Sequence, residues 1–154
     1  MKKLFTGLIV AALLIGVFLL SLPAILHKGG LHPEYLGPTL TRPGKRALII
    51  TTSHGVLAAP GETEGAATGV FGSEMTHPYY TFLDGGMAVD IASIEGGEIP
   101  IDPSSFYFMI KTPEDERYLN DPIAQAKVKN SIPIADVDVE QYDVVFISGG
   151  WGAA

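Results

Sequence analysis

The chain has 154 residues, of which 47% are hydrophobic and 18% are charged, and its formal net charge at pH 7 is −7. Beyond Lys28 it contains 7 basic and 17 acidic residues, a balance that argues against nucleic acid or an anionic lipid surface as the partner of this part. The chain contains no cysteine, which excludes a disulfide, a thiolate metal site and a cysteine nucleophile within these residues. Its four histidines form no HExxH or comparable spacing, so we expect no metal and no other cofactor.

An uncharged apolar segment, residues 4–26, lies near the N-terminus. It follows Lys2 and Lys3 and precedes His27 and Lys28. At about 1.5 Å per residue in a helix, a segment of this length crosses the hydrocarbon core of a bilayer. The segment is therefore either a membrane anchor or a signal peptide.

The length of this segment favours an uncleaved anchor over residues 1–28. A usual signal peptide has a shorter apolar region, and the best candidate cleavage site, after Ala24, has Leu22 at its −3 position. The positions of the basic residues favour a cytoplasmic N-terminus, with the rest of the chain outside the cytoplasm. We expect a single-pass membrane protein; cleavage would instead give a secreted or periplasmic one.

The segment after the anchor, residues 29–44, has no hydrophobic period and is rich in glycine and proline, so it is predicted to be a linker. A domain over residues 45–154 follows. Residues 46–52 form a short apolar β-branched run and predict the first strand. Residues 53–67 are predicted to be a loop.

The middle of the domain alternates between helix and strand patterns. Residues 68–83 predict a helix that is interrupted near Pro78 and ends at Gly85 and Gly86. Residues 87–93 predict the second strand.

A long segment, residues 94–121, is predicted to be irregular, with residues 106–110 packing over a sheet edge or a partner. Residues 122–130 predict a short helix with Pro122 at its first position. Residues 136–141 then lead into the last strand.

The last predicted strand, Val144 to Ile147, is apolar on both faces, as expected for a strand that helices cover on both sides. Gly149 and Gly150 follow at its carboxyl end. In open α/β sheets ligands bind at this end, and paired glycines let backbone N–H groups approach a ligand closely. The alternative is that these two glycines form only a tight turn.

The order of these elements implies parallel strands with right-handed crossovers, which defines the α/β class and a flavodoxin-like, doubly wound sheet. In such a sheet the third strand pairs with the first strand on one side and with a later strand on the other. No later strand follows Val144 to Ile147, and an exposed apolar edge promotes aggregation. We therefore expect the domain to be the first half of a larger one.

Five short segments of the domain match one known family in order and spacing: residues 47–53, 68–74, 77–82, 92–103 and 142–152. Together they resemble the N-terminal half of the ThiJ/PfpI superfamily, which has the class I glutamine amidotransferase-like fold. The match is nearest to the branch of heat-inducible chaperones and glyoxalase-type proteins.

The resemblance implies roles for three residues. Glu74 corresponds to the acid that faces a nucleophilic cysteine and tunes the pKa of its thiol. Gly149 and Gly150 correspond to the turn whose N–H groups face a developing oxyanion. Trp151 stands where this branch often has histidine, which leaves the substrate preference open.

The cysteine and its histidine, which belong to a Cys-His-Gly elbow in the second half of this family, are absent from these residues. His77 is a conceivable substitute base, although its position beside Pro78 favours a structural role at the helix entry. The alternative to the implied role of Glu74 is that it is a solvent-exposed helix residue without a function in a site.

Three functions are compatible with the sequence. The first is a membrane-tethered, cysteine-dependent glyoxalase, deglycase or amide hydrolase that acts on a small carbonyl or amide substrate. The second is a non-catalytic chaperone-like or stress-related binding module, or an inactive fragment. The third, a flavodoxin-like nucleotide binder, is disfavoured because no GxGxxG or GxxxxGK[ST] motif follows Thr52. The sequence leaves open whether the domain forms a homodimer.

Overall fold

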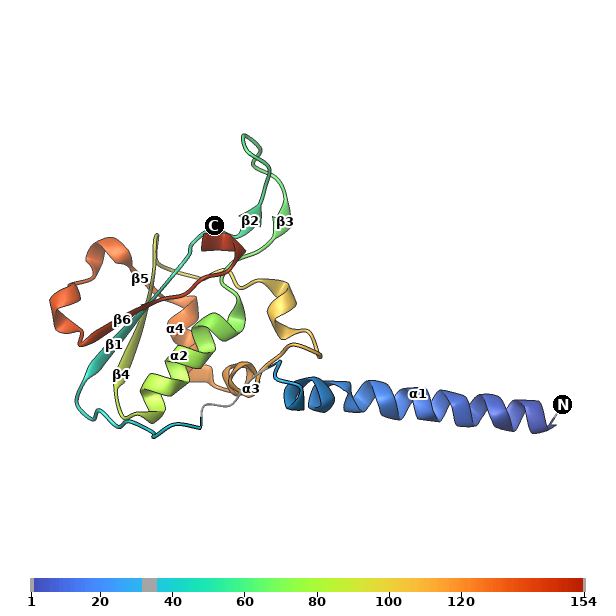
Figure 1. Cartoon of the computed structure of the whole chain (residues 1–154). Helices are drawn as coiled ribbons and strands as arrows, with labels where there is room; N and C mark the ends of the chain where they lie inside the picture. Colours follow the sequence, from blue (N-terminus) through green and yellow to red (C-terminus); the bar gives the residue numbers. More distant parts are fainter. Residues whose placement is uncertain (1, 32–35, 154) are drawn as a thin grey trace. The chain divides into compact units, whose positions relative to one another are not determined.

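The computed structural model describes residues 2–31 and 36–153 of the chain, in two units that are treated separately (Figure 1). The N-terminal unit contains one helix, α1 (Lys2–Lys28). Its stretch Phe5–Lys28 has a mean hydropathy of 2.8 and is long and apolar enough to cross a membrane, properties that a signal sequence shares. Residues 32–35 of the predicted linker lie outside the described residues.

The second unit is built on a parallel four-stranded sheet with the strand order β5-β4-β1-β6. Its strands are β1 (Arg46–Thr51), β4 (Ala88–Ser93), β5 (Ile132–Pro133) and β6 (Val144–Ile147). Strand β1 pairs in parallel with β4 on one side and with β6 on the other. The predicted α/β class with a parallel, flavodoxin-like sheet is therefore confirmed.

One face of the sheet carries the hydrophobic core. Ala47 and Ile49 of β1 and Val89 and Ile91 of β4 belong to it, two residues apart in each strand, as expected because alternate side chains point to the same face. Buried side chains of three helices complete the core, namely α2 (Gly72–Asp84), α3 (Pro113–Leu119) and α4 (Pro122–Lys129). Helix α2 packs against β1 and β4, the two central strands, and α4 packs against β4.

Helix α2 differs from its prediction at its start and at Pro78. It begins at Gly72, because Val70 instead forms a parallel bridge to Ile101. Pro78 lies inside one continuous helix, so the predicted interruption is wrong. The predicted end is confirmed, since Gly85 caps the helix and Gly86 has a φ of +81°.

The segment 94–121, predicted to be irregular, contains helix α3 and a 3₁₀ turn, η1 (Pro103–Phe106). Helix α3 starts with a capping box: Asp115 N donates to Thr112 Oγ1, and Thr112 N donates back to the Asp115 carboxylate. Of residues 106–110, Phe106 packs against the core and stacks on Tyr118, whereas the side chain of Phe108 is 60% exposed. The prediction for this segment was wrong because a seven-residue helix is too short for a visible hydrophobic period.

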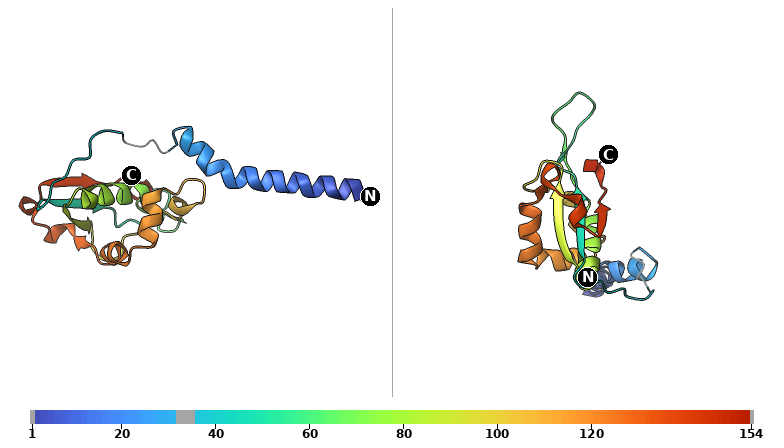
Figure 2. Two further views of the ribbon diagram at one scale, coloured as in Figure 1. Left: turned by 90° about the horizontal axis from the view of Figure 1, so that it is seen from below. Right: turned by 90° about the vertical axis from the view of Figure 1, so that its left-hand side faces the viewer.

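The predicted loop 53–67 contains a small antiparallel hairpin of β2 (Val56–Leu57) and β3 (Ala66–Ala67). The loop between these two strands projects away from the sheet (Figure 2). Two short 3₁₀ turns, η2 (Ile134–Asp136) and η3 (Val139–Gln141), lead into β6, and a third, η4 (Trp151–Ala153), follows it.

Strand β6 has the predicted position but not the predicted burial. Ile147 is 74% exposed, and Val145 and Phe146 are also exposed. Within the described residues β6 pairs only with β1, so its other edge has no neighbouring strand. The expectation that helices cover both faces of β6 is therefore wrong for the described part of the chain.

Candidate functional site

The strand order places a topological switch point between β1 and β6. The chain leaves β1 towards β4 and β5 on one side and returns to β6 on the other side. At such a point the loops after neighbouring strands diverge and leave a crevice at their carboxyl ends, where ligands bind in open α/β sheets. Here the crevice lies between the residues after Thr51 and those after Ile147.

Glu74 lies at this crevice, in the first turn of α2. The Ser148 hydroxyl donates to the Glu74 backbone carbonyl at 3.0 Å, and Ser148 N donates to Ile50 O at 2.9 Å. These two bonds tie the end of β6 to α2 and to β1. The Glu74 side chain is exposed and has no hydrogen bond or ion pair with any described residue.

Gly149 packs directly against the Glu74 side chain. A Cβ atom at Gly149 would collide with Glu74 Oε2, so a larger residue at this position would push the flexible carboxylate away from the turn. The structure thus brings together two of the residues singled out in the sequence, although they are far apart along the chain.

Gly150 has a φ of +111°, and a Cβ there would lie 2.6 Å from Phe71 N and 2.8 Å from Gly69 O. Both its conformation and its surroundings therefore require glycine. The N–H groups of Gly149 and Gly150 donate no hydrogen bond to any described residue. Two free backbone donors beside a carboxylate can bind a carbonyl or an oxyanion.

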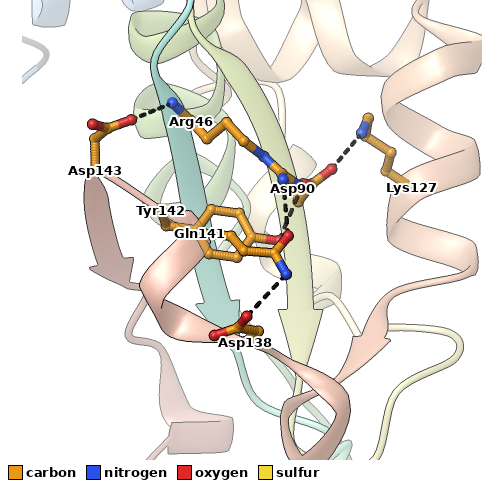
Figure 3. A network of polar contacts seen from close by, with 7 residues as sticks. All are labelled: Arg46, Asp90, Lys127, Asp138, Gln141, Tyr142 and Asp143. Atoms are coloured by element: carbon orange, nitrogen blue, oxygen red, sulfur yellow. Dashed lines mark hydrogen bonds and ion pairs between the residues drawn. The ribbon is translucent and has the colours of Figure 1, made fainter.

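A polar network at the opposite, amino end of the sheet fixes the register in which β6 pairs with β1 (Figure 3). Asp90 of β4 accepts from Arg46 Nη2 at 2.8 Å, from Lys127 Nζ at 3.2 Å and from the Tyr142 hydroxyl at 3.1 Å. The Asp143 carboxylate accepts from Arg46 N at 2.9 Å and from Lys45 Nζ at 2.6 Å. A slip of one residue in β6 would break these bonds, so the network fixes the position of Gly149.

The charges of this network shift the pKa of its members. Burial raises the pKa of Asp90, but its bonds to Arg46, Lys127 and Tyr142 outweigh burial and hold that pKa below its usual value. Burial and the Asp90 charge raise the pKa of the Tyr142 hydroxyl. The sequence analysis missed this network, although charged residues at the start of two predicted strands were a visible signal.

The other sequence candidates lie apart from these contacts. His77 lies in the middle of α2 rather than at its entry, with Nε2 3.0 Å from Glu114 Oε2. Trp151 begins η4 and is 65% exposed. Within residues 2–31 and 36–153, no group of three or more histidine, aspartate or glutamate side chains is arranged to hold a metal ion.

Comparisons with solved structures point to one superfamily. The chain is similar to Rapid Encystment Protein 24 KDa of Francisella tularensis, with 39% identity over 70% of this chain and a TM-score of 0.62. It is also similar to glyoxalase III from Candida albicans, with 27% identity over 70% of this chain and a TM-score of 0.58. Both structures are members of the ThiJ/PfpI superfamily.

The chain spans less than half the length of these two structures, 45% of the first and 44% of the second. No family model matches the chain, and no curated protein sequence matches it.

Proposed function

We propose that the chain is part of a membrane-anchored, cysteine-dependent enzyme of the ThiJ/PfpI type that acts on a small carbonyl or amide compound. In this proposal Glu74 and the turn of Gly149 and Gly150 supply one half of the active site. The observation that carries it is the contact between the Glu74 carboxylate and a turn whose two N–H groups are free. The likeness to glyoxalase III supports a carbonyl substrate.

The proposed chemistry divides the site between two parts of the protein. A cysteine thiolate attacks the carbonyl carbon, and the negative charge that develops on the carbonyl oxygen is held by the N–H groups of Gly149 and Gly150. Glu74 exchanges a proton with the cysteine and so sets the fraction of thiolate. Because these 154 residues contain no cysteine, the nucleophile belongs to a further segment, which would also cover the exposed β6.

The test compares Glu74→Gln and Glu74→Ala in the protein that carries this chain together with its cysteine. Glu74→Ala should lower the turnover of methylglyoxal by at least about tenfold, because a positioned acid–base group contributes that much or more. Both substitutions should also change the pH dependence of thiol alkylation. Glu98→Gln is the matched control, since Glu98 is exposed and lies outside the crevice.

Two outcomes contradict the catalytic proposal. If both Glu74 variants retain the turnover and the alkylation profile of the unchanged protein, Glu74 is a surface residue. If the cysteine-bearing protein turns over neither carbonyl nor amide compounds, the fold serves as a non-catalytic binding module.

The membrane anchor is a separate part of the proposal. It rests on the length and hydropathy of α1. After washing of membranes with alkaline carbonate, the protein should stay in the pellet. Release of a soluble form that lacks residues 1–24 would show instead that the segment is a cleaved signal peptide.

A further inference from the structure

A cavity of about 430 Å³ lies at the carboxyl ends of β1 and β4, beside the turn η4 that follows β6. Its walls come from the three residues after β1, the two residues after β4 and the turn η4; they are Thr52, Ser53, His54, Ile94, Glu95, Gly152 and Ala153. Its volume falls within the lower part of the range of about 300–1,000 Å³ that is usual for small-molecule sites. Neither Glu74 nor Gly149 lines it.

The floor of this cavity is held in place by hydrogen bonds of the Thr52 side chain. The buried Thr52 hydroxyl donates to Gly152 O at 2.5 Å and accepts from His54 N at 2.8 Å. A Cβ at Gly152 would lie 2.5 Å from His54 O, so η4 packs tightly onto the end of β1. Thr52 therefore serves as a support, and its hydroxyl proton is already donated within the fold.

Three groups on the walls do have bonds to offer. Ser53 Oγ accepts from Glu95 N at 2.8 Å, and its own hydroxyl proton has no acceptor among the described residues. The His54 imidazole and the Glu95 carboxylate are exposed, and neither has a hydrogen bond or ion pair with a described residue. The cavity thus presents one hydroxyl donor, one carboxylate acceptor and one imidazole, which can donate or accept a hydrogen bond.

From this arrangement we propose that the cavity binds a small neutral molecule with neighbouring hydroxyl groups, such as a polyol or a sugar of three to five carbons. Each hydroxyl both donates and accepts, so two adjacent ones can donate to Glu95 while one of them accepts from Ser53. The exposed Ile94 side chain gives the C–H groups of the ligand an apolar wall.

Charged ligands fit these groups less well. An anion would meet the Glu95 carboxylate and the net charge of −7 of the chain. A cation would satisfy Glu95 but would leave the Ser53 hydroxyl proton without an acceptor. The cavity adjoins the crevice at Glu74, at the same carboxyl end of the sheet, but neither Glu74 nor Gly149 and Gly150 line it, and the proposal does not depend on the proposed catalysis.

The test is an amide NMR titration of the ¹⁵N-labelled full chain in detergent micelles with D-ribose and with glycerol. Both should shift the amide signals of Ser53, Glu95 and Gly152 in a saturable way, whereas 1-propanol, with a single hydroxyl, should not. Ser53→Ala and Glu95→Gln should each weaken the binding by about three- to tenfold, since each removes or weakens one hydrogen bond. Glu98→Gln removes the same charge three residues away and should bind as the unchanged chain does.

Three results overturn the proposal. The first is the absence of saturable shifts at these three amides. The second is an equal response to 1-propanol or to inorganic phosphate, which would show an apolar or an anion site. The third is undiminished binding by both Ser53→Ala and Glu95→Gln in chains whose spectra otherwise match that of the unchanged protein.

Discussion

The two ends of the sheet differ in how completely their polar groups are paired. At the amino end Asp90 binds three donors and Asp143 binds two, so the charges there are saturated within the fold. At the carboxyl end the side-chain carboxylates of Glu74 and Glu95 and the N–H groups of Gly149 and Gly150 have no hydrogen-bond partner among the described residues. Saturated groups stabilise a fold, whereas unsaturated groups in a crevice are available to a ligand.

The largest loss of stability is expected for Gly150→Ala. The new side chain meets both a positive φ and the close backbone atoms of Phe71 and Gly69, which together should cost about 2–4 kcal/mol. Gly61→Ala is the matched control, because Gly61 has a φ of +89° with open space around it; its cost should be about 1 kcal/mol. Urea unfolding followed by tyrosine near-ultraviolet circular dichroism measures both. Equal losses would show that Gly150 is not crowded.

Asp90→Asn removes the central charge of the polar network at the amino end of the sheet. Losing the charge that accepts from three donors should lower the free energy of unfolding by about 1–2 kcal/mol at pH 7. Asp136→Asn, at an exposed position, should change it by no more than about 0.5 kcal/mol.

The same variant should alter the dependence of stability on pH. Because folding lowers the pKa of Asp90, its stabilising contribution is present above the unfolded pKa of about 3.9 and is lost as the pH falls through the lower folded pKa. Between neutral and strongly acidic pH, the free energy of unfolding should fall by less for Asp90→Asn than for the unchanged chain. Parallel curves for the two proteins would contradict this coupling.

Tyr142→Phe removes one donor from Asp90 but keeps the aromatic ring, which lies 4.9 Å from the guanidinium carbon of Arg46. We expect a loss of about 0.5–1 kcal/mol, the usual value of one hydrogen bond. Tyr107→Phe is the control, since Tyr107 is 64% exposed and its hydroxyl has no bond to a described residue. If both variants unfold alike, the Tyr142 hydroxyl does not stabilise the network.

The fold and the site differ in how far they follow from the sequence. The strands at 46–51, 88–93 and 144–147 were predictable because their apolar β-branched runs are a local signal. Helix α3 was missed because its signal is a capping box at Thr112 rather than a hydrophobic period. The hairpin of β2 and β3 was missed because strands of two residues show no alternation.

The site could be predicted only in part. Gly149 and Gly150 were found from their place at a strand end, and Glu74 from a family resemblance. No spacing in the sequence shows that Glu74 touches Gly149, because the contact depends on the packing of α2 against the end of β6. The cavity at Ser53 and Glu95 was missed for the same reason, since parallel pairing brings the ends of β1 and β4 together.

The smallest effect on stability is expected for Glu74→Gln at the unsaturated end. The side chain is exposed and has no partner among the described residues, and the substitution keeps its shape. Its charge in the first turn of α2 gives only a small favourable interaction with the helix dipole, so the free energy of unfolding should change by no more than about 0.5 kcal/mol. The same urea unfolding assay measures it, with Asp90→Asn as the reference at the saturated end. A loss as large as that of Asp90→Asn would show that Glu74 holds the fold together, and the difference between the two ends of the sheet would no longer hold.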